Sequence, residues 1–139
     1  MAAWQADYAV VPPSGELPDD YRMRLDDVLP RANTWADDLE VWGADQGDRI
    51  DVLHCGAREY EVFARFDLRE WSPALYDRFL AFVRDIGATL HVAPLDAGGP
   101  QVELTREAFQ ASLRVSDACR FVSDPEAYLR SLPEQRGKP

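Results

Sequence analysis

The chain has 139 residues, of which 25 are acidic and 15 basic, so its formal charge is −10 at pH 7. This length fits one domain, and the hydrophobic content of 46% predicts a folded core rather than a disordered acidic tail. The acidic balance argues against a nucleic-acid-binding protein, and no apolar run approaches the roughly 20 residues of a membrane span.

The first residues and the cysteines indicate the compartment. The chain begins without the basic and apolar segments of a secretory signal, so we expect a cytoplasmic protein. Cys55 and Cys119 match no metal-binding spacing. We therefore expect two reduced thiols, no bound metal and no cofactor.

The first third of the chain predicts a strand followed by a helix. Residues 8–11 form a short apolar run that stops at Pro12 and Pro13. Residues 18–29 begin with proline and two aspartates and carry an apolar stripe at helical spacing, which ends at Pro30.

Three central segments predict a meander of strands. Residues 39–42, 49–55 and 59–68 alternate apolar and polar side chains, a pattern typical of half-buried strands. Opposite residues of an antiparallel pair share a face, so loop length sets the register. Closing Cys55 against Glu59 predicts the pairs His54–Tyr60, Val52–Val62 and Ile50–Ala64. Closing Trp42 against Arg49 predicts the pairs Val41–Ile50 and Leu39–Val52.

The second half of the chain predicts helices separated by short strands. Ser72 and Pro73 start a helix that Gly87 ends, and a strand over 89–93 follows. A second strand over 102–104 precedes a helix capped by Thr105, and a last helix begins at 123–126.

These elements predict an α+β fold in the order β-α-β-β-β-α-β-β-α-α. It consists of an antiparallel sheet with a central three-stranded meander and helices packed mainly on one face. We expect a single domain over residues 1–132 and a flexible polar tail over 133–139.

The meander face away from the helices is the candidate binding surface. Its register places Trp42 opposite Arg49, in a cation–π contact, and Phe63 opposite Asp51. Aromatic side chains within a charged rim are typical of protein-binding hot spots. The predicted partner-binding residues are Trp42, Phe63, Glu40, Asp51, Glu61 and Arg65, with Asp45 and Asp48 at the rim of the neighbouring loop. In the alternative, a helix or loop covers this face, and Trp42, Leu53 and Phe63 form a second small core.

No motif selects a catalytic site. The chain lacks the glycine patterns of dinucleotide-binding and P-loop proteins, and it lacks the G-x-S-x-G motif of hydrolases. Asp45, Asp48 and Asp51 fit turn residues of a hairpin better than a calcium loop. His54 and His91 fit hydrogen-bonded, half-buried side chains. We therefore assign no catalytic residue.

Several segments resemble a group of small bacterial proteins. The segments are Val41-Trp42-Gly43, residues 47–52, residues 65–69 and residues 120–126. Over residues 35–132 they resemble small bacterial proteins that carry a W-G…G-x-R-I-D hairpin. The resemblance implies no activity, substrate or site residue.

Three functions remain open at this point. The first is an acidic protein-binding domain of the immunity or antitoxin type, which neutralises a basic protein such as a nuclease toxin. The second is a small-ligand-binding or enzymatic domain with a pocket between sheet and helices that uses His54, His91 or Arg65. The third is a protein that associates with itself as a homodimer. None of them involves nucleic acid or a membrane.

Overall fold

The computed structural model describes residues 2–34, 36–93 and 99–131 of the chain. Within these residues the fold is a mixed α+β arrangement with a seven-stranded antiparallel sheet and five α-helices. The strand order across the sheet is β2-β3-β4-β5-β1-β6-β7. The strands are β1 (Gln5–Val11), β2 (Arg31–Ala32), β3 (Leu39–Gly43), β4 (Arg49–Gly56), β5 (Glu59–Asp67), β6 (Thr89–Val92) and β7 (Gln101–Val102). The helices are α1 (Tyr21–Asp26), α2 (Pro73–Asp85), α3 (Arg106–Arg114), α4 (Asp117–Ser123) and α5 (Pro125–Ser131).

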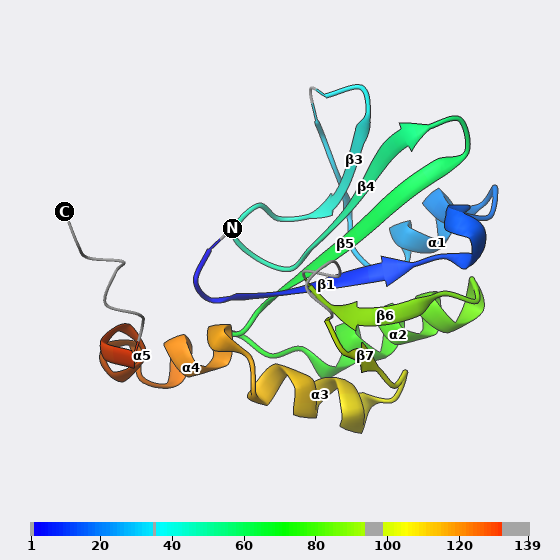
Figure 1. Ribbon diagram of the computed structural model, residues 1–139. Coiled ribbons are helices and arrows are strands. Elements are labelled where there is room, and N and C mark those ends of the chain that lie inside the picture. Colours follow the sequence, from blue (N-terminus) through cyan, green and yellow to red (C-terminus); the bar gives the residue numbers. More distant parts are fainter. Residues whose placement is uncertain (1, 35, 94–98, 132–139) are drawn as a thin grey trace.

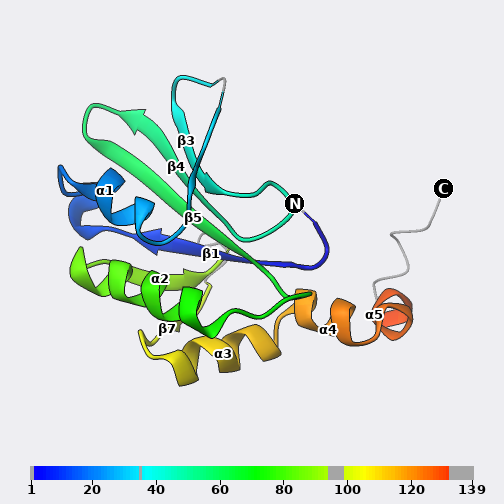
Figure 2. The same ribbon diagram turned by 180° about the vertical axis from the view of Figure 1, so that it is seen from behind.

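The helices form a second layer against one face of the sheet. Figures 1 and 2 show the sheet from opposite sides, with α1 and α2 behind it in the first view and in front of it in the second. The helix α3 runs beside α2, and α4 and α5 project past the start of β1. None of the five helices is long and apolar enough to span a bilayer, as judged over the described residues.

The core between the layers is centred on aromatic rings. Phe66 of β5 lies 4.9 Å from Phe79 of α2 and 5.2 Å from Phe109 of α3, measured between ring centroids. Tyr8 of β1 and Tyr76 of α2 complete the cluster at 6.0 and 5.6 Å from Phe66. All five rings are almost fully buried. Burial of each contributes about 1.5–3 kcal/mol to folding.

The two longest helices begin where the sequence predicts. The Ser72 hydroxyl accepts a hydrogen bond from the Leu75 amide at the start of α2, with Pro73 in the first turn. Thr105 accepts from the Ala108 amide at the start of α3. These caps satisfy amides that the helix itself leaves without acceptors.

The predicted pairs of β4 and β5 are confirmed except next to the loop, where Gly56 rather than Cys55 lies opposite Glu59. His54 faces Tyr60, and the pairs Val52–Val62 and Ile50–Ala64 follow, with a bulge between His54 and Gly56. The two apolar pairs lie on the face that the helices cover, because Ile50, Val52, Val62 and Ala64 are all buried. The alternating pattern was sufficient here because both strands bury one face only.

The predicted register of β3 and β4 is wrong by one residue. Trp42 lies opposite Ile50, and Gly43 lies opposite Arg49. The shift moves every side chain of β3 to the other face of the sheet. Trp42 and Glu40 therefore lie on the helix-covered face, and Val41 and Leu39 lie on the opposite one.

The predicted element order misses β2 and α4. The strand β2 has only two residues and pairs with β3 through Arg31–Trp42 and Ala32–Val41. The helix α4 begins at a Ser116 cap whose hydroxyl accepts from the Cys119 amide. That cap was the available signal for α4. The predicted tail over 133–139 lies outside the described residues.

Candidate functional site

The candidate site is the face of the sheet opposite α1, α2 and α3, which we call the open face. Figures 1 and 2 show those three helices on the other side of the sheet. Side chains of the odd-numbered residues of β1, β3, β4 and β5 lie on this face, because strand residues alternate between faces. They include Asp7, Ala9, Val11, Leu39, Val41, Arg49, Asp51, Leu53, Glu61, Phe63 and Arg65.

One row of side chains crosses the middle of the open face. Register places His91, Ala9, Phe63, Asp51 and Val41 side by side on β6, β1, β5, β4 and β3. Phe63 is 37% exposed, whereas Val41 is 8% exposed. Ala9 has the smallest side chain of the row, so the surface is lower beside the Phe63 ring.

A hollow of about 680 Å³ lies over β1 and β5 next to this ring, which we call the Phe63 hollow. Its apolar wall includes Ala9, Val11, Pro12 and Phe63. Its charged residues are Asp7, Glu61 and Arg65. The volume is within the range of about 300–1,000 Å³ that is typical of ligand pockets.

Both arginines of the open face already form ion pairs with carboxylates. Arg49 reaches Asp51 through Nε and Asp45 through Nη1, each at 2.5 Å. Arg65 Nε lies 3.5 Å from Asp7 Oδ1. Since both guanidinium groups already face carboxylates, neither supplies a free positive charge to a ligand.

The two carboxylates of the Phe63 hollow differ in their surroundings. Asp7 Oδ1 is buried and accepts no hydrogen bond from the described residues. Burial raises the pKa of Asp7, and the attraction of Arg65 offsets this only in part. Glu61 is exposed and has no ion pair within the described ranges, and it accepts a weak hydrogen bond from the Cys55 thiol at 3.4 Å.

Two of the predicted binding residues lie on the wrong face. Trp42 is fully buried, and its Nε1 donates a hydrogen bond to Asp26 at the end of α1. Its cation–π partner is Arg31, with the guanidinium carbon 5.0 Å from the ring centroid, rather than the predicted Arg49. The predicted second core of Trp42, Leu53 and Phe63 does not form, because Trp42 belongs to the main core while Leu53 and Phe63 lie on the open face.

Glu40 is the centre of a hydrogen-bond cluster at the edge of the covered face. Its carboxylate accepts from the Tyr21 hydroxyl, from His54 Nε2 at 2.8 Å and from Arg22 Nε at 2.5 Å. Partial burial alone raises the pKa of Glu40, but these hydrogen bonds outweigh it and lower the pKa to about 2. The residues come from α1, β3 and β4, so no local motif in the sequence indicates the cluster.

The remaining predicted residues divide between the open face and its rim. Phe63, Asp51, Glu61 and Arg65 lie on the open face as expected. Asp45 is exposed and joins the face through Arg49. Asp48 does not belong to the surface of the site, because its carboxylate accepts the Asp67 amide at 2.8 Å and fixes the turn to the end of β5.

The structure does not bring together His54, His91 and Arg65, the residues predicted for a small-ligand-binding or enzymatic domain. His54 lies on the covered face beside Tyr60, whereas His91 hydrogen-bonds to Thr89 and lies next to Ala9 on the open face. Arg65 is on the open face as well. Among the described residues, no group of three or more histidine, cysteine or acidic side chains could hold a metal ion.

Comparison with known proteins gives no further guide to the site. No protein-family model, no curated protein and no solved structure matches this chain.

Proposed function

We propose that this protein is a binding domain whose open face docks a basic partner protein, with a lysine or arginine side chain entering the Phe63 hollow. The observation that carries the proposal is the exposed Phe63 ring beside that hollow, on a sheet face that none of the helices in the described part of the chain covers. A partner of this kind fits the immunity or antitoxin type of protein in the bacterial cytoplasm.

The apolar part of the open face supports a protein partner. Leu39, Leu53 and Val11 are only partly buried there, in addition to the exposed Phe63. An aromatic anchor surrounded by aliphatic side chains is the usual composition of an interface centre. Burial of this apolar area on docking would slow dissociation, and this would account for most of the residence time of the complex.

The charges of the Phe63 hollow support a cationic side chain. Asp7 and Glu61 carry two carboxylates against the single guanidinium of Arg65. Lysine and arginine combine an apolar stem with a charged end, so the stem can lie along Phe63 while the charge meets the carboxylates. A cation over an aromatic ring contributes about 0.5–1 kcal/mol at an exposed site.

The net charge of −10 supports a basic partner at longer range. Opposite charges steer two proteins together and raise the association rate, and added salt reduces this effect. An acidic domain of this size would therefore capture a basic toxin rapidly.

The proposal is tested with two variants of the open face and a matched control. The bait is the whole protein, used to isolate a partner from cells that contain it, and the partner is then purified. Isothermal titration measures its dissociation constant for the wild type, Phe63→Ala, Glu61→Lys and Met23→Ala. Met23 is the control, because it is 72% exposed and lies on α1 at the other side of the sheet.

Phe63→Ala and Glu61→Lys should each weaken binding by about tenfold or more, a change of about 1.4 kcal/mol. Met23→Ala should leave the dissociation constant unchanged, and binding by the wild type should weaken steadily as salt is added. The proposal is wrong if a purified partner binds both open-face variants as tightly as the wild type. It is also wrong if size-exclusion chromatography shows a homodimer that Phe63→Ala converts to a monomer, because the open face would then bind a second copy.

A further inference from the structure

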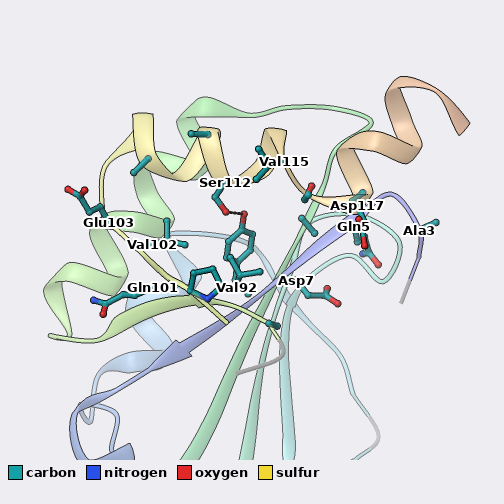
Figure 3. Close-up of a pocket in the computed structure, with 18 of the residues that line it drawn as sticks. Ala3, Gln5, Asp7, Val92, Gln101, Val102, Glu103, Ser112, Val115 and Asp117 are labelled. Atoms are coloured by element: carbon teal, nitrogen blue, oxygen red, sulfur yellow. Dashed lines mark hydrogen bonds between the residues drawn. The ribbon is translucent and has the colours of Figure 1, made fainter. Parts of the chain in front are cut away.

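A second concavity lies on the other side of β1, between the sheet and the last helices. It is a groove of about 1220 Å³ bounded by β1, β6 and β7 on one side and by α3, α4 and Tyr128 of α5 on the other. Figure 3 shows Glu103 at one end, Asp117 at the other, and Ser112 between them. We call it the α3–α4 groove. It shares Asp7 with the Phe63 hollow but includes neither Phe63 nor Glu61.

The walls of this groove are small and largely apolar. Ala6, Ala108, Ala111 and Ala118 contribute to them, and Val115 at the rim is 79% exposed. Alanine side chains let a ligand approach the backbone of a helix or strand closely, because they fill little of the space beside it. The volume exceeds the range of about 300–1,000 Å³ usual for small molecules, and it suits a stretch of polypeptide.

The floor of the groove is held in place by a partly buried hydrogen bond. The hydroxyl groups of Tyr8 on β1 and Ser112 on α3 lie 2.7 Å apart, as Figure 3 shows. Tyr8 is 1% exposed, and burial raises the pKa of its hydroxyl to about 12. The bond joins the sheet to α3 and therefore fixes the width of the groove at its centre.

The charge of the groove has one sign. Its described lining residues include the carboxylates of Asp7, Glu103 and Asp117 and no arginine, lysine or histidine. Asp117 forms an exposed ion pair with Arg120 at 3.2 Å, and Glu103 forms none among the described residues. An exposed ion pair contributes little, so a competing cation can replace Arg120 at small cost.

We propose that the α3–α4 groove binds an amphipathic peptide segment that carries basic side chains on one side and apolar side chains on the other. The apolar side would lie on the alanines and Val115, and the basic side chains would reach Glu103 and Asp117 at the two ends. Peptide recognition of this kind uses a shallow apolar groove for affinity and charged rims for orientation.

The test uses two fluorescent peptides and measures binding by fluorescence anisotropy. The first is an amphipathic helix of about 18 residues built from leucine and lysine, long enough to form a helix when bound. The second has the same leucines with glutamate in place of lysine. The protein variants are Ala111→Trp, which fills the groove, and Ala74→Trp, which places the same side chain at an exposed position of α2 outside it.

The lysine peptide should bind saturably, and Ala111→Trp should raise its dissociation constant by about tenfold or more. Ala74→Trp should leave that constant unchanged, and the glutamate peptide should not bind. Glu103→Gln should weaken binding by a smaller factor, and Glu107→Gln on the exposed start of α3 should not change it. Melting temperatures equal to that of the wild type show that each variant is folded.

Three results would overturn the inference. These are binding of the lysine peptide that does not saturate, equal weakening by both tryptophan variants, and binding of the glutamate peptide as tight as that of the lysine peptide. Equal weakening by both variants would mean that the peptide follows the overall negative charge of the protein rather than the groove. Phe63→Ala should not affect this peptide, so the outcome is independent of the test of the open face.

Discussion

The indole Nε1 of Trp42 lies 2.7 Å from Asp26 Oδ1 and donates a hydrogen bond to it. Asp26 is the last residue of α1, and Trp42 is a fully buried residue of β3. Tyr21 of the same helix packs edge-on against the Trp42 ring at 6.5 Å. The contacts join α1 to the sheet and give the buried indole N–H its acceptor.

Replacement of Asp26 should therefore destabilise the protein. In Asp26→Ala the buried Nε1–H loses its acceptor, which should lower the free energy of unfolding by about 1–3 kcal/mol. Asp27→Ala is the control, because Asp27 is exposed and is expected to change stability by less than about 0.5 kcal/mol. Urea denaturation followed by tryptophan fluorescence measures both. Equal stabilities of the two variants would show that the hydrogen bond does not hold α1 on the sheet.

The hydrogen bonds to Glu40 should make stability depend on acid pH. The pKa of Glu40 in the folded protein is about 2, below its ordinary value of 4.5. Its ionised form therefore stabilises the fold fully above pH 4.5, and this contribution is lost as the pH falls towards 2. Glu40→Gln should lower the free energy of unfolding by about 1–2 kcal/mol at pH 7. Denaturation curves between pH 7 and 2 should show the two proteins converging in acid.

Glu70→Gln provides the control for this pH dependence, because Glu70 is an exposed residue just after β5. Its difference from the wild type should be small at every pH. If Glu40→Gln also differed from the wild type by a constant amount across the range, the ionised carboxylate would not be the cause.

The turn between β3 and β4 should tolerate alanine at one glycine and not at the other. Gly43 has a φ of +99°, and an added Cβ would lie 2.1 Å from the Asp48 carbonyl oxygen. Gly43→Ala should therefore cost about 1–3 kcal/mol in strain. At Gly47 an added Cβ meets only the Ala44 side chain, at an ordinary distance of 3.5 Å. Calorimetry of both variants should show a lower melting temperature for Gly43→Ala, and similar values would contradict this account of the turn.

Two phenylalanines of β5 should respond differently to truncation. Phe66→Ala removes a fully buried ring and should cost about 3–5 kcal/mol. Phe63 lies on the open face and is 37% exposed, so Phe63→Ala should cost less than about 1.5 kcal/mol. Chemical denaturation distinguishes them. A large loss for Phe63→Ala would mean that this ring serves the core and not a partner.

Part of the candidate site could be predicted from local pattern. The strands β4 and β5 alternate over their whole length, and a short loop joins them, so the positions of Asp51, Glu61 and Phe63 on one face follow from the register. The position of Ala9 in the same row could not be predicted, because β1 pairs with β5 from far away in the sequence.

Local sequence pattern was enough to predict the fold class, the strand alternation of the meander and the starts of α2 and α3, because each depends on neighbours within a few residues. The face on which the side chains of β3 lie depends instead on long-range packing. Leu39 and Val41 compete with Glu40 and Trp42 for the interior, and one residue of loop length changes the outcome. The helix α1 settles it, because Asp26, Tyr21 and Arg22 give Trp42 and Glu40 the hydrogen bonds that burial requires.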